Sequence, residues 1–271
     1  MLYNCHTHTK YSHDSAAEPA AMCDAAANAG LSGLLISDHC DCEYADHTDF
    51  FSMFQSCEKE CAAFKKRCKD LRVHFGIELG DPVYNADFAK KIVKACDFDA
   101  VLLSVHAVRL CGFDMPFSLI DFGDKNDAFI RSYLIQYFND VLYTVQTAPD
   151  FDVLCHLTVP LRYITLQYGK KADVHTYYPV IAQILGALAA RGKALEINTS
   201  ALAYENGFLM PDKEIAAMFL TLGGRYFTVG SDAHKPENVA FGLNEAAKML
   251  KSLGVKDACC FDKRKIITYP L

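Results

Sequence analysis

No apolar run in the 271-residue sequence is long enough to cross a membrane. The longest stretches, such as "FDAVLL" and "ILGALAA", fall well short of the roughly 20 residues that a membrane-spanning helix needs. The start, "MLYNCHTHTK", lacks the basic and then apolar pattern of a secretory signal. We therefore expect a cytoplasmic protein without membrane association.

The sequence also lacks an excess of positive charge. It has 27 basic and 33 acidic residues, which gives a formal net charge of -6. Proteins that bind a long nucleic-acid track do so by neutralising many phosphates, and this composition argues against such a track. A small basic pocket remains compatible with it. Because 51% of the residues are hydrophobic, the chain can bury a sizeable core.

None of the 12 cysteines forms a CxxC pair, and we predict no disulfide framework. Most cysteines are interpreted as small buried hydrophobic residues. Cys57, Cys61 and Cys68 have a spacing that could place three sulfurs on one face of a helix. Because that helix also needs an apolar stripe, a core role is favoured over cluster binding.

No linker, low-complexity tract or repeat divides the chain, so residues 1–271 are predicted to form a single domain. The absence of GxGxxG and GxxxxGK[ST] removes two common nucleotide-binding interpretations. Short apolar runs alternate with segments of helical period, which predicts parallel strands with helices outside them. The expected strands are Leu2–Cys5, Gly33–Ser37, Arg72–Ile77, Ala100–Ser104, Asp152–Cys155, Ala194–Ile197 and Tyr226–Val229.

Helices are expected near 18–29, 50–69, 85–96, 126–147, 174–191, 212–222 and 236–252. Glycines such as Gly30 and Gly192 suit helix ends. Seven β/α units in one α/β chain favour a distorted (β/α)7 TIM-like barrel over an open sheet. The last 15 residues, "DACCFDKRKIITYPL", suggest one or two further short strands or a tail packed on the outside.

Ionisable residues follow six of the seven predicted strands. In a parallel barrel all carboxyl ends of strands share one face, so these side chains should converge on one pocket. A lone histidine after a strand is more often structural, but histidines concentrated at one edge favour a metal site. The residues are His6, His8, Asp38, His39, Glu78, His106, His156, Asp232 and His234.

Imidazoles and carboxylates without strand-end cysteine ligands suit zinc, manganese or iron. A catalytic ion takes about three protein ligands, so eight or nine convergent ligands imply two or three ions. His6 and His8 are two residues apart on an extended segment and point the same way, and Asp232 and His234 repeat this spacing. Asp14, or less favourably the adjacent His13, would return from the following loop.

The ordered phrases resemble the polymerase and histidinol phosphatase (PHP) family of metal-dependent phosphoesterases, in particular its histidinol-phosphate phosphatase branch. The resemblance covers nearly the whole chain and implies a distorted seven-stranded barrel that holds three divalent ions. The phrases that carry it are "HTHTKYSHDS", "LLISDHCD", "GIELG", "LLSVHAV", "DFGDK", "FDVLCHLTVPLRY", "LEINTSAL" and "FTVGSDAHKP".

The resemblance also distributes the ligands. By it, the first ion would take His6, His8, Glu78 and Asp232, the second Glu78, His106 and His156, and the third Asp14, His39 and His234. Glu78 would bridge the first two ions and be the most sensitive ligand. Asp38 could orient a ligand imidazole or cap the next turn.

Arg162 in "LRY" matches an arginine that binds the substrate phosphate in relatives, and a guanidinium can hold two phosphate oxygens. The alternative for Arg162 is a surface arginine packed on Tyr163. After "LEINTSAL" relatives typically carry a second phosphate-binding arginine, whereas this chain has Ala203. The departure puts the identity of the substrate in question.

The resemblance implies hydrolysis of L-histidinol phosphate to L-histidinol and phosphate, in histidine biosynthesis, by a metal-bridging hydroxide. Asp232, His234 and a metal-bound water are the candidate proton donors to the leaving group. The segment "CDCEYADHTDFFSMF" is expected to border the pocket and select the alcohol. The alternatives are another small phosphomonoester or nucleotide as substrate, and a non-catalytic metal-binding module.

Overall fold

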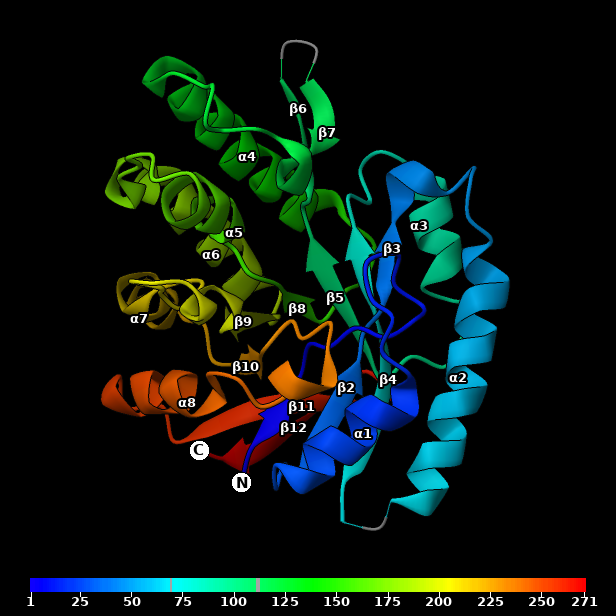
Figure 1. The fold of residues 1–271 in the computed structure, drawn as a ribbon. Coiled ribbons are helices and arrows are strands. Elements are labelled where there is room, and N and C mark those ends of the chain that lie inside the picture. Colours follow the sequence, from blue (N-terminus) through cyan, green and yellow to red (C-terminus); the bar gives the residue numbers. More distant parts are fainter. Residues whose placement is uncertain (69, 111–112) are drawn as a thin grey trace.

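A nearly closed barrel of seven parallel strands forms the centre of the computed structural model, which describes residues 1–68, 70–110 and 113–271 (Figure 1). Strand β10 returns to β1 through backbone hydrogen bonds, since Cys5 N donates to Val229 O at 2.8 Å and Asp232 N to His6 O at 2.9 Å. The predicted TIM-like barrel is confirmed. Its strands, in spatial order, are β1 (Tyr3–Asn4), β2 (Gly33–Ile36), β4 (Arg72–Gly80), β5 (Ala100–Ser104), β8 (Val153–Leu154), β9 (Ala194–Asn198) and β10 (Phe227–Gly230).

Three further strands lie beyond the predicted strand ends. The short strand β3 (His39–Asp41) pairs with the far end of β4, with His39 opposite Glu78. Strands β6 (Ala107–Leu110) and β7 (Phe113–Pro116) form an antiparallel hairpin that projects past the barrel directly after His106 (Figure 1). These additions extend the carboxyl end of the barrel, where the predicted ligands lie.

Helices cover the outside of the strands, as the alternation predicted (Figure 1). Side chains that precede them satisfy donors of the first turn: Asn126 Oδ1 accepts from Phe129 N at 2.9 Å, and Asp212 Oδ1 from Ile215 N at 3.0 Å. The larger helices are α1 (Pro19–Asn28), α2 (Phe50–Arg67), α3 (Ala86–Ile92), α4 (Asp127–Thr147), α6 (Tyr178–Ala190), α7 (Lys213–Thr221) and α8 (Leu243–Ser252).

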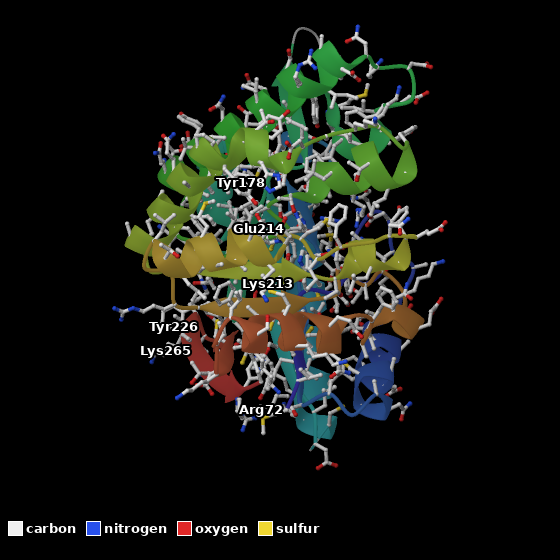
Figure 2. All side chains as sticks on the ribbon, turned by 90° about the vertical axis from the view of Figure 1, so that its left-hand side faces the viewer. Arg72, Tyr178, Lys213, Glu214, Tyr226 and Lys265 are labelled. Carbon is white, nitrogen blue, oxygen red and sulfur yellow. The ribbon has the colours of Figure 1, made fainter. Side chains whose placement is uncertain are left out.

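Short helical turns fill several loops at the ligand end. They are 3-10 turns at Cys42–Tyr44, Phe117–Leu119, Val174–Tyr177, Ser200–Ala203 and Pro236–Asn238, the three-residue helix α5 (Val159–Leu161) and a π-helical turn at Arg162–Gln167. Helix α2 ends before residue 69, which lies outside the described residues. On the outer face, α6 and α7 are joined where Tyr178 Oη donates to Glu214 Oε2 at 2.9 Å (Figure 2).

The helix predicted over 236–252 is wrong in its first half. The chain makes only a 3-10 turn at Pro236–Asn238, turns at Gly242 with φ 69°, and starts α8 at Leu243. Tertiary packing overrides the helical period here. Thr199 Oγ1 donates to Phe241 O at 2.6 Å, and a Cβ atom at Gly242 would lie 2.7 Å from Thr199 Cβ.

The C-terminal residues close the amino end of the barrel as an antiparallel hairpin of β11 (Asp257–Asp262) and β12 (Lys265–Pro270). Two further strands were among the expectations, but the tail is not simply packed on the outside. Cys259 and Phe261 pack against inward-facing residues of the barrel, namely Leu35, Ala100, Leu102, Val153, Cys155 and Ala194. The hairpin therefore supplies part of the barrel core.

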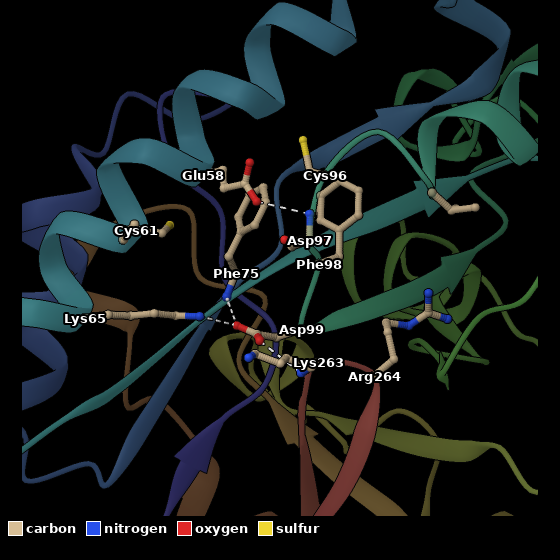
Figure 3. A pocket seen from close by; sticks show the side chains of 12 residues that line it. Glu58, Cys61, Lys65, Phe75, Cys96, Asp97, Phe98, Asp99, Lys263 and Arg264 are labelled. Atoms are coloured by element: carbon tan, nitrogen blue, oxygen red, sulfur yellow. Dashed lines mark hydrogen bonds and ion pairs between the residues drawn. The ribbon is translucent and has the colours of Figure 1, made fainter.

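The Asp99 carboxylate, which is 1% exposed, fastens this hairpin to the barrel wall. It accepts hydrogen bonds from Lys65 Nζ at 2.6 Å, Phe75 N at 2.9 Å and Lys263 N at 3.0 Å (Figure 3). One buried carboxylate thus links α2, β4 and the turn between β11 and β12. The donors come from parts of the chain that are far apart in sequence.

Among the residues that the structure describes, no helix combines the length and the apolar character that crossing a membrane requires.

Candidate metal centre

The carboxyl ends of the strands bring six histidines and three carboxylates together. His6 and His8 follow β1, His39 begins β3, and Glu78 lies near the end of β4. The nine predicted metal ligands lie in one cluster, linked by contacts of 3.8 Å or less. They are His6, His8, Asp14, His39, Glu78, His106, His156, Asp232 and His234.

Glu78 lies at the centre of the cluster and its side chain is fully buried. Its two carboxylate oxygens face different imidazoles, and Ser104 Oγ also donates to Oε1. The neighbouring nitrogens are His156 Nε2 (2.9 Å) and His106 Nε2 (3.2 Å) at Oε1, and His39 Nδ1 (2.8 Å), His6 Nε2 (3.4 Å) and His8 Nε2 (3.5 Å) at Oε2. No other carboxylate among the nine predicted ligands faces as many imidazoles.

His6 and His8 point the same way, as their spacing predicts, with ring centroids 5.0 Å apart. Asp232 faces both, because its Oδ1 lies 3.1 Å from His8 Nε2 and 3.8 Å from His6 Nε2. One ligand atom from each of these three residues fits within 4.8 Å of the others. Glu78 Oε2 lies 3.4 Å from the same His6 nitrogen and 3.5 Å from the same His8 nitrogen, so all four residues of the first group are brought together.

The group expected for a third ion lies at the rim. Asp14 Oδ2 is 3.1 Å from His234 Nε2, and Asp14 Oδ1 is 3.7 Å from His39 Nε2. His13 is exposed, and its ring centroid stands 5.3 Å from that of His39. Of the two adjacent residues, Asp14 is the one whose side chain joins both histidines.

Several buried polar atoms of the cluster have no hydrogen-bond partner, although most buried polar atoms in proteins are satisfied. These atoms are His6 Nε2, His8 Nε2, His39 Nδ1, Glu78 Oε2 and His234 Nε2. The nitrogens of His6, His8 and His39 lie around Glu78 Oε2, and His234 Nε2 lies at the rim beside Asp14. Imidazole nitrogens and carboxylate oxygens of this kind are ligands for zinc, manganese or iron, so the residues fit a group of divalent cations.

The carboxylates and imidazoles of the cluster shift one another's pKa values. Burial opposes ionisation of Glu78, but the imidazoles of His6, His39 and His106 outweigh it and hold its pKa well below the ordinary value. Burial and the neighbouring His234 and His39 lower the pKa of His8, which keeps this imidazole neutral. Burial lowers the pKa values of His6, His39 and His106, but the neighbouring carboxylates outweigh it and raise all three, that of His39 to about 10. Because metals bind neutral imidazoles, cation binding at these three residues would release protons.

The ligand histidines are oriented by side chains that the sequence analysis did not assign. Glu196 Oε1 lies 2.7 Å from His6 Nδ1, Asp41 Oδ1 lies 2.8 Å from His106 Nδ1, and Ser12 Oγ lies 3.0 Å from His8 Nδ1. A partner on the second ring nitrogen fixes the tautomer and the direction of the ligand nitrogen. The feature of the sequence that could have identified Glu196 is its position in a predicted strand, whose carboxyl end lies at the same face of the barrel as the predicted metal ligands.

Asp38 orients no imidazole directly, so the first of its two expected roles is wrong. Its carboxylate accepts from Thr9 N at 2.6 Å, Thr9 Oγ1 at 2.8 Å and Ser12 Oγ at 2.7 Å. These bonds shape the loop that follows β1. Asp38 therefore acts on His8 only through Ser12.

Two residues of the cluster have left-handed backbone conformations, which are uncommon for residues other than glycine. His156 has φ 22° and Asp232 has φ 54°. Such conformations persist where surrounding contacts hold them, and they concentrate at functional sites. Here Glu196 Oε2 accepts from His156 N at 2.8 Å, and the backbone of Asp232 is bonded to His6 O.

Arg162 lies beside the cluster, in a cavity of about 650 Å³. Its Nη1 donates to Ser200 Oγ at 2.7 Å and stands 3.8 Å from Asp232 Oδ2, and its Nη2 donates to Tyr163 Oη at 2.7 Å. The guanidinium also stacks over the Tyr163 ring at 4.8 Å, so the alternative contact with Tyr163 is present too. Its buried Nε lacks a hydrogen-bond partner among the described residues.

Part of the cavity wall is apolar. The segment after β2 contributes to it, as expected, through Tyr44, Phe50 and Met53, and the loop after β7 contributes Phe117 and Leu119. Ala203, at the position of an expected arginine, is exposed in a 3-10 turn and does not line the cavity. Within the described cavity lining, Arg162 is the only guanidinium.

The cysteines of α2 take no part in this centre. Cys57 and Cys61 are buried with their sulfurs 4.0 Å apart, and Cys57 Sγ lies 3.6 Å from Asp38 Oδ2. Cys68 caps the end of the helix and is partly exposed. The arrangement is that of a core face, as the sequence favoured.

A model of the PHP domain matches residues 4–200, more than half of the chain. The chain belongs to the PHP domain family. The resemblance seen in the sequence is thereby confirmed. A probable histidinol-phosphatase of Clostridium acetobutylicum is 28% identical over 269 residues, which cover 97% of this chain and 98% of the relative. A probable histidinol-phosphatase of Thermotoga maritima is 27% identical over 273 residues and all of both chains.

Among solved structures, the histidinol phosphate phosphatase of Lactococcus lactis matches with a TM-score of 0.80 and 22% identity, over 98% of each chain. That crystal structure is a complex with zinc, L-histidinol and phosphate. The similarity shows that this PHP domain protein has the same fold.

Proposed function

We propose that this protein is a metal-dependent phosphomonoesterase that hydrolyses L-histidinol phosphate to L-histidinol and phosphate. The observation that carries the proposal is the buried Glu78 carboxylate, faced by five imidazoles beside a cavity that Arg162 lines. Hydrolysis of a phosphate monoester needs an activated water and compensation of phosphoryl charge. The names of the relatives from Clostridium acetobutylicum and Thermotoga maritima support the choice of ester.

The proposed cofactors are three divalent cations, either zinc, manganese or iron. When bound, such cations lower the pKa of water towards about 7 and compensate charge on phosphoryl oxygens. The proposed ligands are His6, His8, Glu78 and Asp232 for the first, Glu78, His106 and His156 for the second, and Asp14, His39 and His234 for the third. Glu78 serves two of the three groups.

Arg162 is proposed to bind the phosphate. Its guanidinium is held by Ser200 and Tyr163 on one side, and its remaining N–H groups can donate to two phosphate oxygens. The positive charge of Arg162 and the divalent cations would meet the phosphate from two directions. A small phosphorylated molecule is the substrate class that such an arrangement selects.

Asp232, His234 and a metal-bound water are the candidate proton donors to the leaving alcohol. Asp232 Oδ1 faces His8, whereas its Oδ2 faces Arg162 Nη1 at 3.8 Å and so lies on the phosphate side. His234 lines the same cavity, with its Nε2 directed at Asp14. Asp232 Oδ2 is therefore nearer to the phosphate side. Burial opposes ionisation of Asp232, but the imidazoles of His6, His8 and His234 outweigh it and hold its pKa well below the ordinary value, so Asp232 would have to relay a proton taken from water.

Other small phosphomonoesters, including nucleotides, are the second candidate substrates. Ala203 does not supply a second guanidinium, and Phe50, Met53 and Phe117 form an apolar wall that suits a range of alcohols. The phosphate site would be the same for these esters. The alcohol alone distinguishes the two candidates.

Phosphate release tests the proposal directly. Metal-analysed protein is assayed with L-histidinol phosphate beside mononucleotides and aryl and alkyl phosphates. The expected result is the highest kcat/KM for L-histidinol phosphate. A higher value for another ester would transfer the proposal to that substrate. If metal-replete protein released phosphate from none of these esters, the proposal would be wrong. A non-catalytic metal-binding module would then be the remaining interpretation.

A further inference from the structure

A continuous chain of side-chain hydrogen bonds runs from Arg162 to the ligand histidines. Arg162 Nη1 donates to Ser200 Oγ at 2.7 Å, and Ser200 Oγ donates to Asn198 Oδ1 at 2.7 Å. Asn198 Nδ2 donates to Glu196 Oε2 at 3.2 Å, and Glu196 Oε1 accepts from His6 Nδ1 at 2.7 Å. The chain thus connects the proposed phosphate ligand with a proposed metal ligand.

We propose that Ser200, Asn198 and Glu196 are positioning residues that hold the Arg162 guanidinium at a fixed place relative to His6 and His156. The inference rests on the proposed function, because it assigns to Arg162 the binding of phosphate. It adds three residues that touch neither ion nor substrate.

The donor and acceptor of each hydrogen bond between Arg162 and His6 can be assigned in one consistent direction. Arginine can only donate, so Ser200 accepts from it and gives its single hydroxyl proton to Asn198. The Asn198 carbonyl is then the acceptor and its amide the donor toward Glu196. Glu196 Oε1 accepts the Nδ1 proton of His6, so a neutral His6 presents an unprotonated Nε2 to the cluster.

Glu196 is built into the barrel. It is 1% exposed, and its Oε2 also accepts from His156 N, where the backbone has a left-handed φ. The carboxylate fits because residue 230 is glycine: a Cβ atom at Gly230 would collide with Glu196 Oε1 and would lie 2.5 Å from His6 Cβ. One carboxylate therefore sets the ring of His6 and the backbone of His156.

Strand β9 and the turn that follows it fix the remaining members. Glu196 and Asn198 are two residues apart, so their side chains share one face of the strand. Asn198 is held by paired backbone hydrogen bonds with Met210 of 2.8 and 2.9 Å, and its Oδ1 also accepts from Ser200 N at 3.0 Å. Ser200 is thereby oriented before the guanidinium contacts it.

Correct placement matters here because Arg162 is the only guanidinium in the described cavity lining. Ala203, at the position where the resemblance implies a second arginine, supplies no guanidinium and does not line the cavity. Without Ser200 Oγ, Nη1 loses its neutral acceptor, and Asp232 Oδ2 at 3.8 Å becomes the nearest alternative. We expect the guanidinium to turn toward Asp232 and away from the phosphate.

The test compares Ser200→Ala with Ser200→Thr, which keeps a hydroxyl, and with Ser56→Ala on the exposed face of α2 as the matched control. Binding of inorganic phosphate to metal-loaded protein is measured by calorimetry, together with metal content, thermal unfolding, and KM and kcat. The loss of one hydrogen bond to a charged group corresponds to a loss of about tenfold in affinity. We expect a tenfold weaker phosphate affinity and a higher KM for Ser200→Ala, recovery in Ser200→Thr, and no change in metal content.

Glu196→Gln tests the other end of the chain. A glutamine cannot accept from both His6 and His156, so we expect metal content and affinity to fall about 10–100-fold, as for other orienting partners of ligand histidines. Unchanged phosphate affinity in Ser200→Ala, or unchanged metal affinity in Glu196→Gln, would overturn the inference. Phosphate binding needs no turnover, so these results are independent of which ester is hydrolysed.

Discussion

Asp41 Oδ1 occupies the space that a Cβ atom at Gly80 would need. The same oxygen lies 2.8 Å from His106 Nδ1 and so directs the opposite nitrogen of that ring toward Glu78. The lack of a side chain at Gly80, which lies at the end of β4, allows this approach. Gly80, which lies beyond the strand predicted over Arg72–Ile77, therefore belongs to the candidate metal centre.

Gly80→Ala should therefore displace Asp41 and release His106. We expect a loss of metal affinity of about 10–100-fold, which is typical of a lost orienting partner. Metal content after dialysis and the metal dependence of activity measure the effect. Gly186→Ala in α6 is the control, because no heavy atom lies within 4 Å of its Cβ position. Full metal retention in Gly80→Ala would contradict the role given to Asp41.

Glu78→Gln should remove the carboxylate that faces two of the three proposed ion sites. We expect loss of bound metal and at least a hundredfold fall in kcat/KM, since a ligand shared by two ions affects both. Saturating metal stabilises a folded protein by about 2.7 kcal/mol at one hundred times Kd, so chelation should lower the Tm of the native protein. The Tm of Glu78→Gln should respond less to chelator. Native metal content with native turnover would refute the assignment.

Asp14→Asn and His13→Asn form a matched pair. Asp14 reaches His39 and His234, whereas His13 is exposed and its side chain has no hydrogen bond among the described contacts. We expect Asp14→Asn to lose about one equivalent of metal per chain and His13→Asn to retain it. Elemental analysis after gel filtration decides between them. The reverse result would make His13 the ligand.

Arg162→Lys should weaken phosphate binding although it keeps the charge. A lysine cannot offer the planar pair of N–H donors or the contacts with both Ser200 and Tyr163. Loss of one to two charged hydrogen bonds predicts an increase in KM of about 10–100-fold. Steady-state kinetics with the best substrate provide the measurement. A native KM would instead favour the interpretation of Arg162 as an arginine packed on Tyr163.

Asp99→Asn should destabilise the fold away from the metal centre. Burial opposes ionisation of Asp99, but hydrogen bonds from Lys65 and from the N–H groups of Phe75 and Lys263 outweigh it and lower its pKa below the ordinary 3.8. Replacing this charged acceptor should reduce the free energy of unfolding by about 1.5–3 kcal/mol at pH 7.

The pH dependence follows from the direction of that shift. A carboxylate with a lowered pKa stabilises the fold above its unfolded value, and the contribution disappears as the pH falls through the folded value. Urea unfolding should therefore show a constant difference between the native protein and Asp99→Asn above about pH 5 that narrows below 3.8. Asp97→Asn, at an exposed neighbouring position in the same pocket, is the control (Figure 3). A difference that persists at the lowest pH would show that charge is not the cause.

The sequence was informative about elements whose signal is local. The apolar runs located β2, β5 and β9 within one or two residues, because strands buried on both faces need continuous hydrophobic sequence. The helix over 236–252 was predicted wrongly, since contacts of Thr199 with residues 241 and 242 break a period that is otherwise helical. Thr199 lies about 40 positions before these residues, so its contacts cannot be detected from a short stretch of sequence around the helix.

By itself the sequence determined the barrel and the side chains at its carboxyl edge. Parallel strands place their carboxyl ends together, so His6, Glu78 and Asp232 had to converge once the strands were recognised. Only the tertiary structure decided which atoms orient them. The pairs of Glu196 with His6 and of Asp41 with His106 depend on rotamers and on space above Gly230 and Gly80. Such contacts join residues up to 190 positions apart, and three-dimensional packing alone sets distances of this kind.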